Sequence, residues 1–288
     1  MQILHLPNAK ELTWRYYNHA LLPNCAPHEK ADVEILKNKN FWKTFRPKRP
    51  LFACYTTHFD CGYETGWWHC ILDKPFDIAT IKSERRRQIN QGLQNFDIRV
   101  IDVKIYAEQI FDVHKSAWKT YNKTGKFKIE KEHFCEEVRK WNYLVFGAFD
   151  KGNDQLVAYY TVKVYPAYIC LMTLKANPAA EKKRVNLAIN YFVCDFFRKE
   201  IENGKYIGGG NRNIYHKTNF QEFLEKNFGF KKAYNHLHIK YVPFVAFLIK
   251  ILYPFRKIIK KIPFTIANQV SGILLMEEIC RERRKFSQ

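Results

Sequence analysis

The stretch Tyr143–Leu174, YLVFGAFDKGNDQLVAYYTVKVYPAYICLMTL, decides the fold class of this 288-residue chain. It contains three strand-like runs, Tyr143–Phe149, Gln155–Val164 and Ala167–Leu174, and the turn sequence Asp150–Asn153 joins the first two. Runs of this length, separated by Gly, Asn and Asp, are typical of hairpin-joined strands. We therefore predict hairpin-joined strands at the centre of the chain.

Helical and strand periodicity continues on both sides of this stretch. The predicted elements are strand Asp97–Val103, helices Ala107–Thr120 and Glu130–Trp141, helix Ala179–Asn203, strand Lys205–Gly209, helix Asn219–Asn227 and strand Lys231–Val242. Hairpin-joined strands followed by crossover helices describe a mixed α/β sheet that is covered on both faces. Ligands of such sheets bind where neighbouring strands diverge at their carboxyl ends, which here lie near Leu174 and Gly209.

The order of these elements resembles that of the GNAT superfamily of acyltransferases. Thr218–Pro243, TNFQEFLEKNFGFKKAYNHLHIKYVP, is similar to the end of a GNAT-type domain, and Glu84–Val100, ERRRQINQGLQNFDIRV, is similar to the segment before the second domain of Fem-type aminoacyltransferases. The resemblance implies an α/β (α+β mixed-sheet) GNAT-like acyl-CoA N-acyltransferase fold. We expect a degenerate, partial N-terminal half with a basic linker helix at 1–96, the acyltransferase domain at 97–242 and a tail of basic amphipathic helices at 243–288.

The resemblance also implies a place for the acyl donor. In GNAT-type enzymes the pantetheine of acyl-CoA lies along the fourth strand, and its pyrophosphate lies on the N-terminus of the next helix, where unpaired N–H groups and the helix dipole hold phosphate. The loop that leads into this helix departs from the glycine-rich family pattern, because Asn177–Arg184 contains Pro178 and Glu181 and no glycine. The matching donor-binding residues are Met172, Thr173, Leu174, Lys182, Lys183, Arg184 and Asn219.

Catalytic groups are assigned from the same resemblance. Many GNAT enzymes carry a Tyr in the last helix that protonates the leaving thiolate, and this chain has Leu224 and Glu225 at that place. The candidates nearby are Tyr206, Tyr215 and His216. His216 is the candidate base for the attacking amine, because a base works best when its pKa is near the operating pH. It is also open to a reading as an ordinary surface histidine.

Candidate acceptor-binding residues lie between the last predicted strands. Asn211, Arg212 and Asn213 follow three glycines, which allow close backbone approach to a ligand but also make an ordinary mobile turn. The run Arg85–Arg87 supplies phosphate-binding guanidinium groups. Three consecutive helical residues cannot all point the same way, so we expect one of them, Arg86, to be functional.

The composition limits the partners and the redox state. A formal charge of +20 attracts polyanions, which include RNA, anionic lipid and a phosphorylated cofactor. The eight cysteines contain no CxxC pair and read as reduced core residues of a cytoplasmic protein. Metal-ligand atom types gather in Cys54–Cys70, but their spacing disfavours zinc, so we expect no metal. The N-terminus lacks the pattern of a signal peptide.

The stretch Tyr241–Cys280 differs from the rest of the chain. Its apolar runs are interrupted by basic residues, and each is shorter than the roughly 20 residues needed to span a bilayer. Pro243, Pro254 and Pro263 divide the stretch into predicted short helices of the kind that bind anionic membrane surfaces. We expect peripheral attachment to the inner face of the membrane; the alternative is a helical pair that packs on the domain.

These observations lead to one main function and two alternatives. The main one is transfer of an acyl group from acyl-CoA, as co-substrate, to an amino group of an envelope-related, lipid-linked acceptor. The first alternative is a Fem-like aminoacyltransferase whose donor is aminoacyl-tRNA. In catalysis we expect nucleic acid to take part only as this donor. The second is a non-catalytic RNA- or tRNA-binding module on the same fold. Loss of the glycine-rich loop favours the last, whereas the polar residues after Gly210 favour an enzyme.

Overall fold

The computed structural model describes residues 13–121, 127–214, 219–262 and 265–286. The chain divides into two compact units, each built from segments distant in sequence. Unit 1 comprises Met1–Cys70, Asn211–Asn219 and Lys232–Gln288, and unit 2 comprises Ile71–Gly210 and Phe220–Lys231. The linear division into 1–96, 97–242 and 243–288 stays a prediction.

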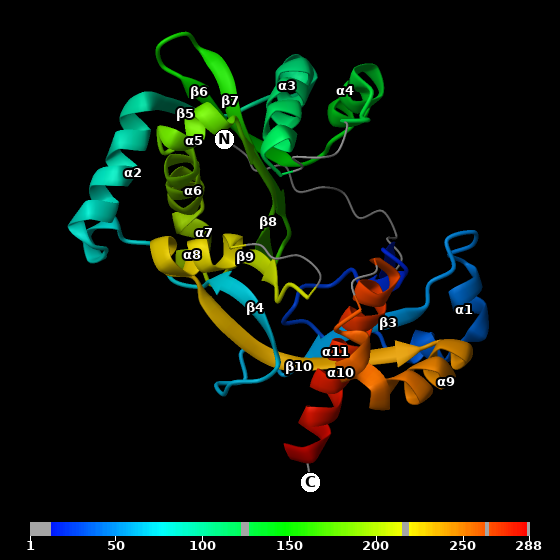
Figure 1. Cartoon of the computed structure of the whole chain (residues 1–288). Coiled ribbons are helices and arrows are strands. Elements are labelled where there is room, and N and C mark those ends of the chain that lie inside the picture. The colour runs from blue at the N-terminus through cyan, green and yellow to red at the C-terminus, as the bar shows by residue number, and fades with distance from the viewer. Residues whose placement is uncertain (1–12, 122–126, 215–218, 263–264, 287–288) are drawn as a thin grey trace. The chain divides into compact units, whose positions relative to one another are not determined.

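Unit 2 contains a mixed five-stranded sheet in the order β5-β6-β7-β8-β9 (Figure 1). The first three pairs are antiparallel, and β8 and β9 are parallel. The hairpin predicted around Asp150–Asn153 is therefore present, and β7 and β8 form a second antiparallel pair. The bounds of the strands are β5 Phe96–Val100, β6 Leu144–Asp150, β7 Gln155–Val164, β8 Tyr168–Ala176 and β9 Tyr206–Asn211.

Helices cover the two faces of this sheet. Figure 1 shows α3 and α4 on one side of it and α2 and α6 (Val185–Phe196) on the other. Apolar side chains at helical spacing on α3 and α4 pack against β6 and β7, because burial of such a face is the main source of helix stability in a protein. The bounds are α2 Ser83–Asn95, α3 Val103–Tyr121, α4 Lys131–Arg139 and α8 Phe220–Phe228, and the short η2 is Ile78–Thr80.

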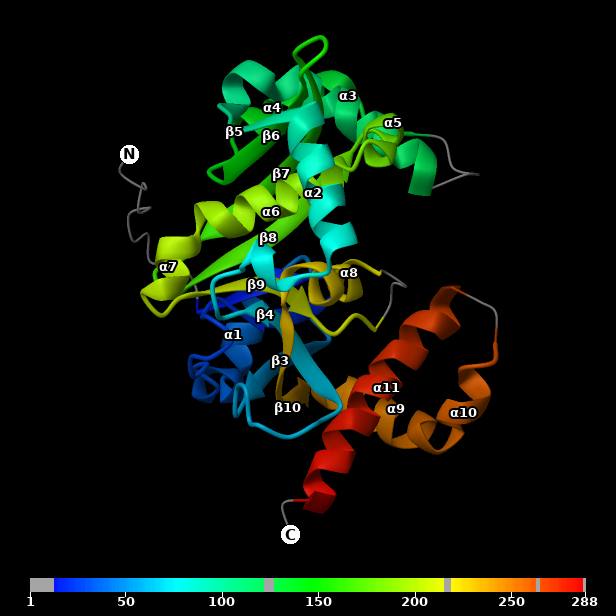
Figure 2. The ribbon, with the colours of Figure 1, turned by 90° about the vertical axis from the view of Figure 1, so that its left-hand side faces the viewer.

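The single long helix predicted over Ala179–Asn203 is wrong. The chain forms α5 Pro178–Lys182, α6 Val185–Phe196 and α7 Arg198–Glu202 instead (Figure 2). The first break lies at Arg184, whose backbone has φ +74°, and a residue with the left-handed conformation cannot continue a right-handed helix. The predicted stop at Asn203-Gly204 is confirmed, because Asn203 is the C-cap of α7 and Gly204 has φ +89°.

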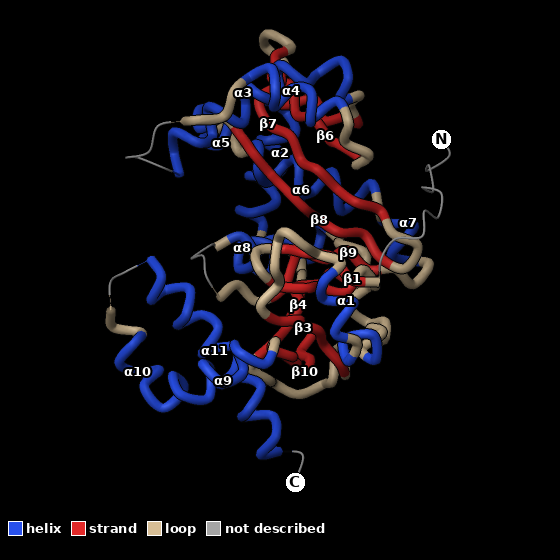
Figure 3. Tube along the Cα trace, turned by 90° about the vertical axis from the view of Figure 1, so that its right-hand side faces the viewer, coloured by secondary structure: helices blue, strands red, loops and turns tan. Residues whose placement is uncertain are grey.

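Unit 1 contains the sheet β1-β2-β3-β10-β4. Its first hairpin, in which Asn18 and His19 at positive φ join β1 to β2, was not predicted from the sequence. In Figure 3 the strands of this sheet are drawn in red. The bounds are β1 Trp14–Tyr17, β2 Ala20–Pro23, η1 Glu34–Lys37, α1 Lys39–Lys43, β3 Phe52–Thr57, β4 Trp67–Leu72 and β10 Lys231–Tyr241.

Helices follow β10 from Pro243 onward, in the segment predicted as a helical tail. This segment forms α9 Pro243–Leu252, η3 Tyr253–Phe255, α10 Arg256–Ile259 and α11 Thr265–Phe286. The prediction of short helices holds for the first three of these elements, whereas α11 has 22 residues because its polar and apolar residues continue without a proline. Within the described residues, no helix combines the length and the hydropathy that crossing a membrane requires.

Candidate active site

The strands β8 and β9 pair only at their amino ends. Their parallel register joins Tyr168 to Tyr206, Ile169 to Ile207 and Cys170 to Gly208, and it stops there although β8 continues to Ala176. The two strands that the sequence analysis selected are therefore neighbours that stop pairing toward their carboxyl ends. A separation of this kind is where sheets of this class bind ligands, because the edges beyond it are not paired with each other.

A β-bulge lies on β8 beside this separation. Thr161 of β7 pairs with Thr173 and Val162 pairs with Leu171, so Met172 is the extra residue. The Thr173 N–H donates a 3.0 Å hydrogen bond to the Thr161 hydroxyl, which compensates the ladder where it is interrupted. A bulge leaves the backbone of its extra residue outside the regular ladder and is common next to active sites. The Met172 side chain is 44% exposed.

Three consecutive basic residues lie after β8, at the end of α5 and in the turn that leads into α6. Lys182, Lys183 and Arg184 are all exposed. Lys183 forms a 2.8 Å ion pair with Asp150, and this hydrogen bond lowers the pKa of the Asp150 carboxyl. The Arg184 carbonyl accepts hydrogen bonds from the N–H groups of Leu187 and Ala188, so Arg184 begins α6. The N-terminus of α6 thus carries helix-dipole charge and two cations besides the paired Lys183.

The preceding helix α5 contributes no comparable site. The Asn177 side chain accepts a 2.9 Å hydrogen bond from the Ala179 N–H, and Pro178 at the first helical position has no N–H to offer. The amino end of α5 is therefore capped by the protein itself. Any phosphate bound in this region would meet α6 rather than α5.

A partly buried polar cluster that was not predicted from the sequence joins α3 to β7 and β8. His114 Nδ1 and the Tyr159 hydroxyl lie 2.9 Å apart, and Tyr159 is the register partner of Lys175 on β8. Burial, and secondarily the charge of Lys175, lowers the pKa of His114, so its imidazole is neutral near pH 7. Burial also lowers the pKa of Lys175 and raises that of Tyr159. The only sequence signal was a lysine within an apolar strand.

The three predicted catalytic residues are placed unequally. Tyr215 and His216 lie outside the described residues. Tyr206 opens β9, nearly buried, with its ring stacked on Tyr168 at a centroid distance of 5.5 Å. Tyr206 therefore lies at the paired end of the strands and not at their open end, a position that favours a packing role.

The predicted acceptor-binding residues belong mostly to unit 1. Asn211 and Asn213 are exposed, as is Asn219, which was predicted to bind the donor. Arg212 donates its backbone N–H to the Trp68 carbonyl and a side-chain N–H to the Gly66 carbonyl. These two hydrogen bonds hold Arg212 against the start of β4 and the residue before it. Arg86 lies on α2 in unit 2 and is partly exposed. Thr173 and Leu174 are partly buried on β8, opposite Thr161 and Tyr160.

The metal-ligand atom types near the start of the chain serve other contacts in unit 1. The ring of His69 is 2.7 Å from the Asn235 amide, and burial lowers its pKa to about 4. His58 lies 3.1 Å from the Thr57 hydroxyl. Over the part of the chain that the structure describes, no group of three or more His, Cys, Asp or Glu side chains is arranged to hold a metal ion.

Comparison with known proteins found no match among protein-family models and none among curated proteins. Among solved structures, a protein described as the C-terminal domain of a lysylphosphatidylglycerol synthetase from Agrobacterium fabrum is 10% identical, with a TM-score of 0.49, and the match covers 83% of this chain and 84% of that one. L-PGS from Bacillus licheniformis is 12% identical, with a TM-score of 0.48 over the same shares. A tandem GNAT protein from the clavulanic acid biosynthesis pathway is 8% identical, with a TM-score of 0.45 over 77% and 75%.

Each TM-score is below 0.5, so the fold is assigned from the chain's own topology. Its order is β5-α3-α4-β6-β7-β8, then the α5–α7 crossover, then β9-α8-β10. The strands follow one another in the predicted order and the β6–β7 hairpin is where it was predicted, whereas three helices replace the single predicted crossover helix. The chain has a GNAT-like mixed α/β fold.

Proposed function

We propose that this protein is a GNAT-like N-acyltransferase that takes its acyl group from acyl-CoA. One observation carries the proposal: the parallel pair β8 and β9 stops at Cys170 and Gly208, the Met172 bulge lies farther along β8, and the N-terminus of α6 follows that strand after the short helix α5. An unpaired strand edge suited to the thioester arm and a cationic helix end suited to its phosphates, both in unit 2, support the proposal.

The chemistry asked of this site is aminolysis. The amine nitrogen attacks the thioester carbonyl carbon, the carbon–sulfur bond breaks, a base takes the proton of the amine and the thiolate leaves or is protonated. Backbone N–H groups outside the ladder at Met172 are suited to hold the thioester arm, and charge-assisted contacts from Lys182 and Arg184 are suited to the phosphates. The neutral imidazole of His114 is a candidate base beside the predicted His216.

The first test is calorimetric titration with CoA and acetyl-CoA at moderate salt, with ATP and a short RNA as polyanion controls. A protein of charge +20 binds any polyanion loosely, so specific binding must survive added salt and exceed that of ATP. Arg184→Gly should weaken CoA binding roughly five- to tenfold, the loss of one charge-assisted contact. The matched control is Lys104→Ala, which removes one exposed cation from α3. Binding that equals ATP, or falls equally in both variants, would sink the acyl-CoA proposal.

An aminoacyl-tRNA donor is the second candidate function. The observation that favours it is the α5–α6 turn, where no glycine is present and Asn177 and Pro178 close one helix end. A titration with aminoacylated and deacylated tRNA distinguishes the two candidates, since a donor site for the aminoacyl group prefers the charged form. Equal binding of both tRNA forms, without CoA binding, would instead indicate the non-catalytic RNA-binding alternative.

We further propose that the acceptor is lipid-linked, because the tail is suited to an anionic membrane surface. Between Val242 and Met276 the sequence has no Asp or Glu, whereas Lys250, Arg256, Lys257, Lys260 and Lys261 are present. Exposed large apolar side chains gather in the same segment: Phe244, Phe247, Leu248, Ile251, Phe255, Ile258 and Ile262. Exposed apolar side chains among cations without acids are the composition of an interfacial helix.

Vesicle sedimentation tests this attachment. The side chain of Phe247 is 61% exposed. The variant Phe247→Asp should lose most of its vesicle binding, because about 1.5–3 kcal/mol of free energy from burying the ring in the membrane is lost and a negative charge is added. The matched control is Ile105→Asp, since Ile105 on α3 is 73% exposed and lies outside the tail. Binding should require vesicles that contain phosphatidylserine and weaken with salt. Equal binding of both variants, or equal binding to neutral vesicles, would contradict the proposal.

A further inference from the structure

Unit 1 contains a pocket beneath α9 that the acyltransferase proposal does not use. Its accessible volume is about 380 Å³. The lining residues come from the end of β10, the inner face of α9, η3 and α11: Ile239, Tyr241, Ala246, Ile249, Lys250, Tyr253, Pro254, Glu277 and Arg281. The pocket therefore combines an apolar side with a charged side in a volume suited to a small ligand group.

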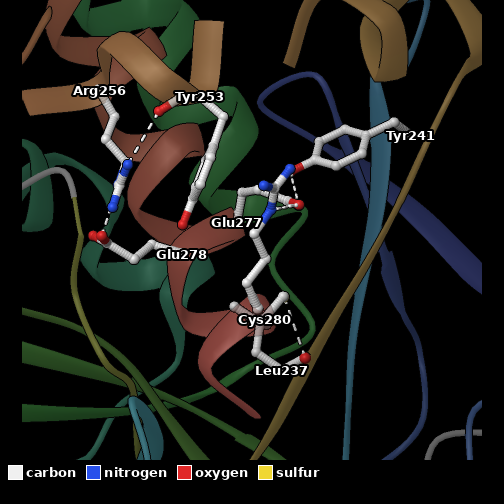
Figure 4. A network of polar contacts seen from close by, with 8 residues as sticks. Leu237, Tyr241, Tyr253, Arg256, Glu277, Glu278 and Cys280 are labelled. Atoms are coloured by element: carbon white, nitrogen blue, oxygen red, sulfur yellow. Dashed lines mark hydrogen bonds and ion pairs between the residues drawn. The ribbon is translucent and has the colours of Figure 1, made fainter. Parts of the chain in front are cut away.

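A polar network fixes the charged side of this pocket (Figure 4). Glu277 is 6% exposed, and its two carboxylate oxygens accept hydrogen bonds from the Tyr241 hydroxyl at 3.1 Å and from Arg281 Nε at 2.8 Å. Burial, and next the Glu277 charge, raises the pKa of Tyr241, so its phenol keeps the proton that it donates. The buried carboxylate is thus fully compensated within the protein.

Tyr253 holds the cations of this network in place. The guanidinium carbon of Arg281 lies 3.6 Å from the centroid of the Tyr253 ring, and that of Arg256 lies 4.3 Å from the same centroid. Arg256 is also paired with Glu278 at 2.7 Å. Arg281 stacks its guanidinium on the ring and donates its Nε–H to Glu277. A guanidinium has five N–H groups, so the terminal nitrogens of Arg281 can donate further hydrogen bonds.

The charges that line the pocket do not cancel. Lys250 and Arg281 contribute two positive charges and Glu277 one negative charge. Glu277 is already paired with Arg281, and no acidic partner of Lys250 is found among the described residues. The ammonium group of Lys250 is therefore the excess charge, and it selects for an anion at this place.

The apolar surroundings identify what kind of anion would fit. Ala246, Ile249, Lys250 and Tyr253 line the pocket from one face of α9 and η3, whereas Phe244 and Phe247 are exposed on the same helix. An anion bound beside Lys250 would thus have a large apolar surface next to it. Free phosphate makes no use of that surface, whereas a phospholipid uses it for its acyl chains.

We propose that this pocket binds the phosphate headgroup of one anionic phospholipid, with Lys250 and Arg281 as its cations and the exposed face of α9 along its acyl chains. The proposal rests on the membrane attachment proposed above and adds a defined lipid site to it. A lipid site of this kind orients the protein on the bilayer, which a diffuse basic surface does not.

Calorimetric titration of the full chain with a soluble short-chain lipid tests the pocket apart from the membrane surface. Dihexanoyl phosphatidic acid, below its micelle concentration, should bind at least tenfold more tightly than both dihexanoyl phosphatidylcholine and glycerol 3-phosphate. Lys250→Gln should weaken this binding roughly tenfold. The matched control Lys257→Gln, which removes a cation from α10 outside the pocket lining, should stay within twofold of the wild type.

A second variant keeps the charged residues of the pocket and fills its volume. Ala246→Trp fills the pocket from α9 and should abolish lipid binding, whereas Val245→Trp, one position away and outside the lining, should not. Equal binding of the anionic lipid and phosphatidylcholine, equal losses in Lys250→Gln and Lys257→Gln, or equal binding of glycerol 3-phosphate and the lipid would each overturn the proposal. CoA titration of the same variants keeps the two proposals apart, since pocket variants should bind CoA as the wild type does.

Discussion

Helices α6 and α9 are both rich in apolar side chains, but their surroundings differ. Seven of the 12 residues of α6 are buried, whereas Ile249 is the one buried residue among the ten of α9. In unit 2, α6 is covered by α2 on one side and by the sheet on the other, so the apolar residues of α6 form part of the core. In the described part of unit 1, no element covers the outer face of α9. Similar composition therefore supports stability in one helix and offers an interaction surface in the other.

Truncation of one isoleucine in each helix should give the largest contrast. Ile189 of α6 is fully buried, so Ile189→Ala should lower the free energy of unfolding by about 2–5 kcal/mol through lost burial and a cavity. Ile251 of α9 is 47% exposed, so Ile251→Ala should change it by less than about 0.5 kcal/mol. Denaturant unfolding of both variants measures the difference. Similar losses would mean that the outer face of α9 is covered in solution.

The free energy of unfolding should depend on pH through His69, a buried histidine of unit 1 that lies outside the tail. Burial lowers the pKa of His69 to about 4, below its ordinary value of 6.5. Between these values the unfolded chain binds the proton and the folded chain does not, so stability falls as the pH drops from 6.5 to 4. The full loss amounts to about 3 kcal/mol.

The measurement is the free energy of unfolding against pH for the wild type and His69→Gln. Glutamine keeps an acceptor for the Asn235 amide and has no proton to gain, so the pH dependence should be shallower in the variant. Curves of equal slope would show that His69 does not titrate in this window.

The packing of α2 on α6 should tolerate little added volume. A Cβ at Gly92 would lie 2.7 Å from the Arg184 carbonyl oxygen and 2.9 Å from the Ala188 Cβ. Gly92→Ala gains about 1 kcal/mol of helix propensity but overpacks a contact with backbone, which costs about 1–3 kcal/mol. We expect a net loss of about 1 kcal/mol in denaturant unfolding. The exposed neighbour variant Gln91→Ala should lose nothing, and a gain in Gly92→Ala would show that the helices separate easily.

The fold was predictable from the sequence where local chemistry and burial agree. The strands β6 to β8 lie within two residues of their predicted bounds, because turn residues and β-branched runs mark them clearly. The β1–β2 hairpin was missed because its turn, Asn18-His19, contains no glycine. The Met172 bulge and the contact between His114 and Tyr159 were also missed, since both arise from pairing between distant segments.

The candidate site followed the same rule. The two strands that separate and the basic residues after them were predicted, because strand order and charge are visible in a sequence. The break before α6 was not, since an arginine at positive φ is imposed by its surroundings rather than favoured by its own conformational preference. Arg184 therefore has two parts: its backbone begins α6, and its side chain is a proposed cation for CoA.

Arg184→Gly should separate these two roles with the smallest change in stability. Its φ of +74° costs a non-glycine residue about 1–2 kcal/mol, and glycine removes that cost while losing about 0.5–1 kcal/mol of backbone entropy. The expected result is an unfolding free energy unchanged or raised by up to about 1.5 kcal/mol, together with weaker CoA binding. Lys182→Gly, at the helical end of α5, removes the same charge without that relief and should lose stability. If Arg184→Gly unfolds more easily than the wild type, the arginine holds α6 through contacts of its side chain, and its loss of CoA binding would then report on structure rather than on charge.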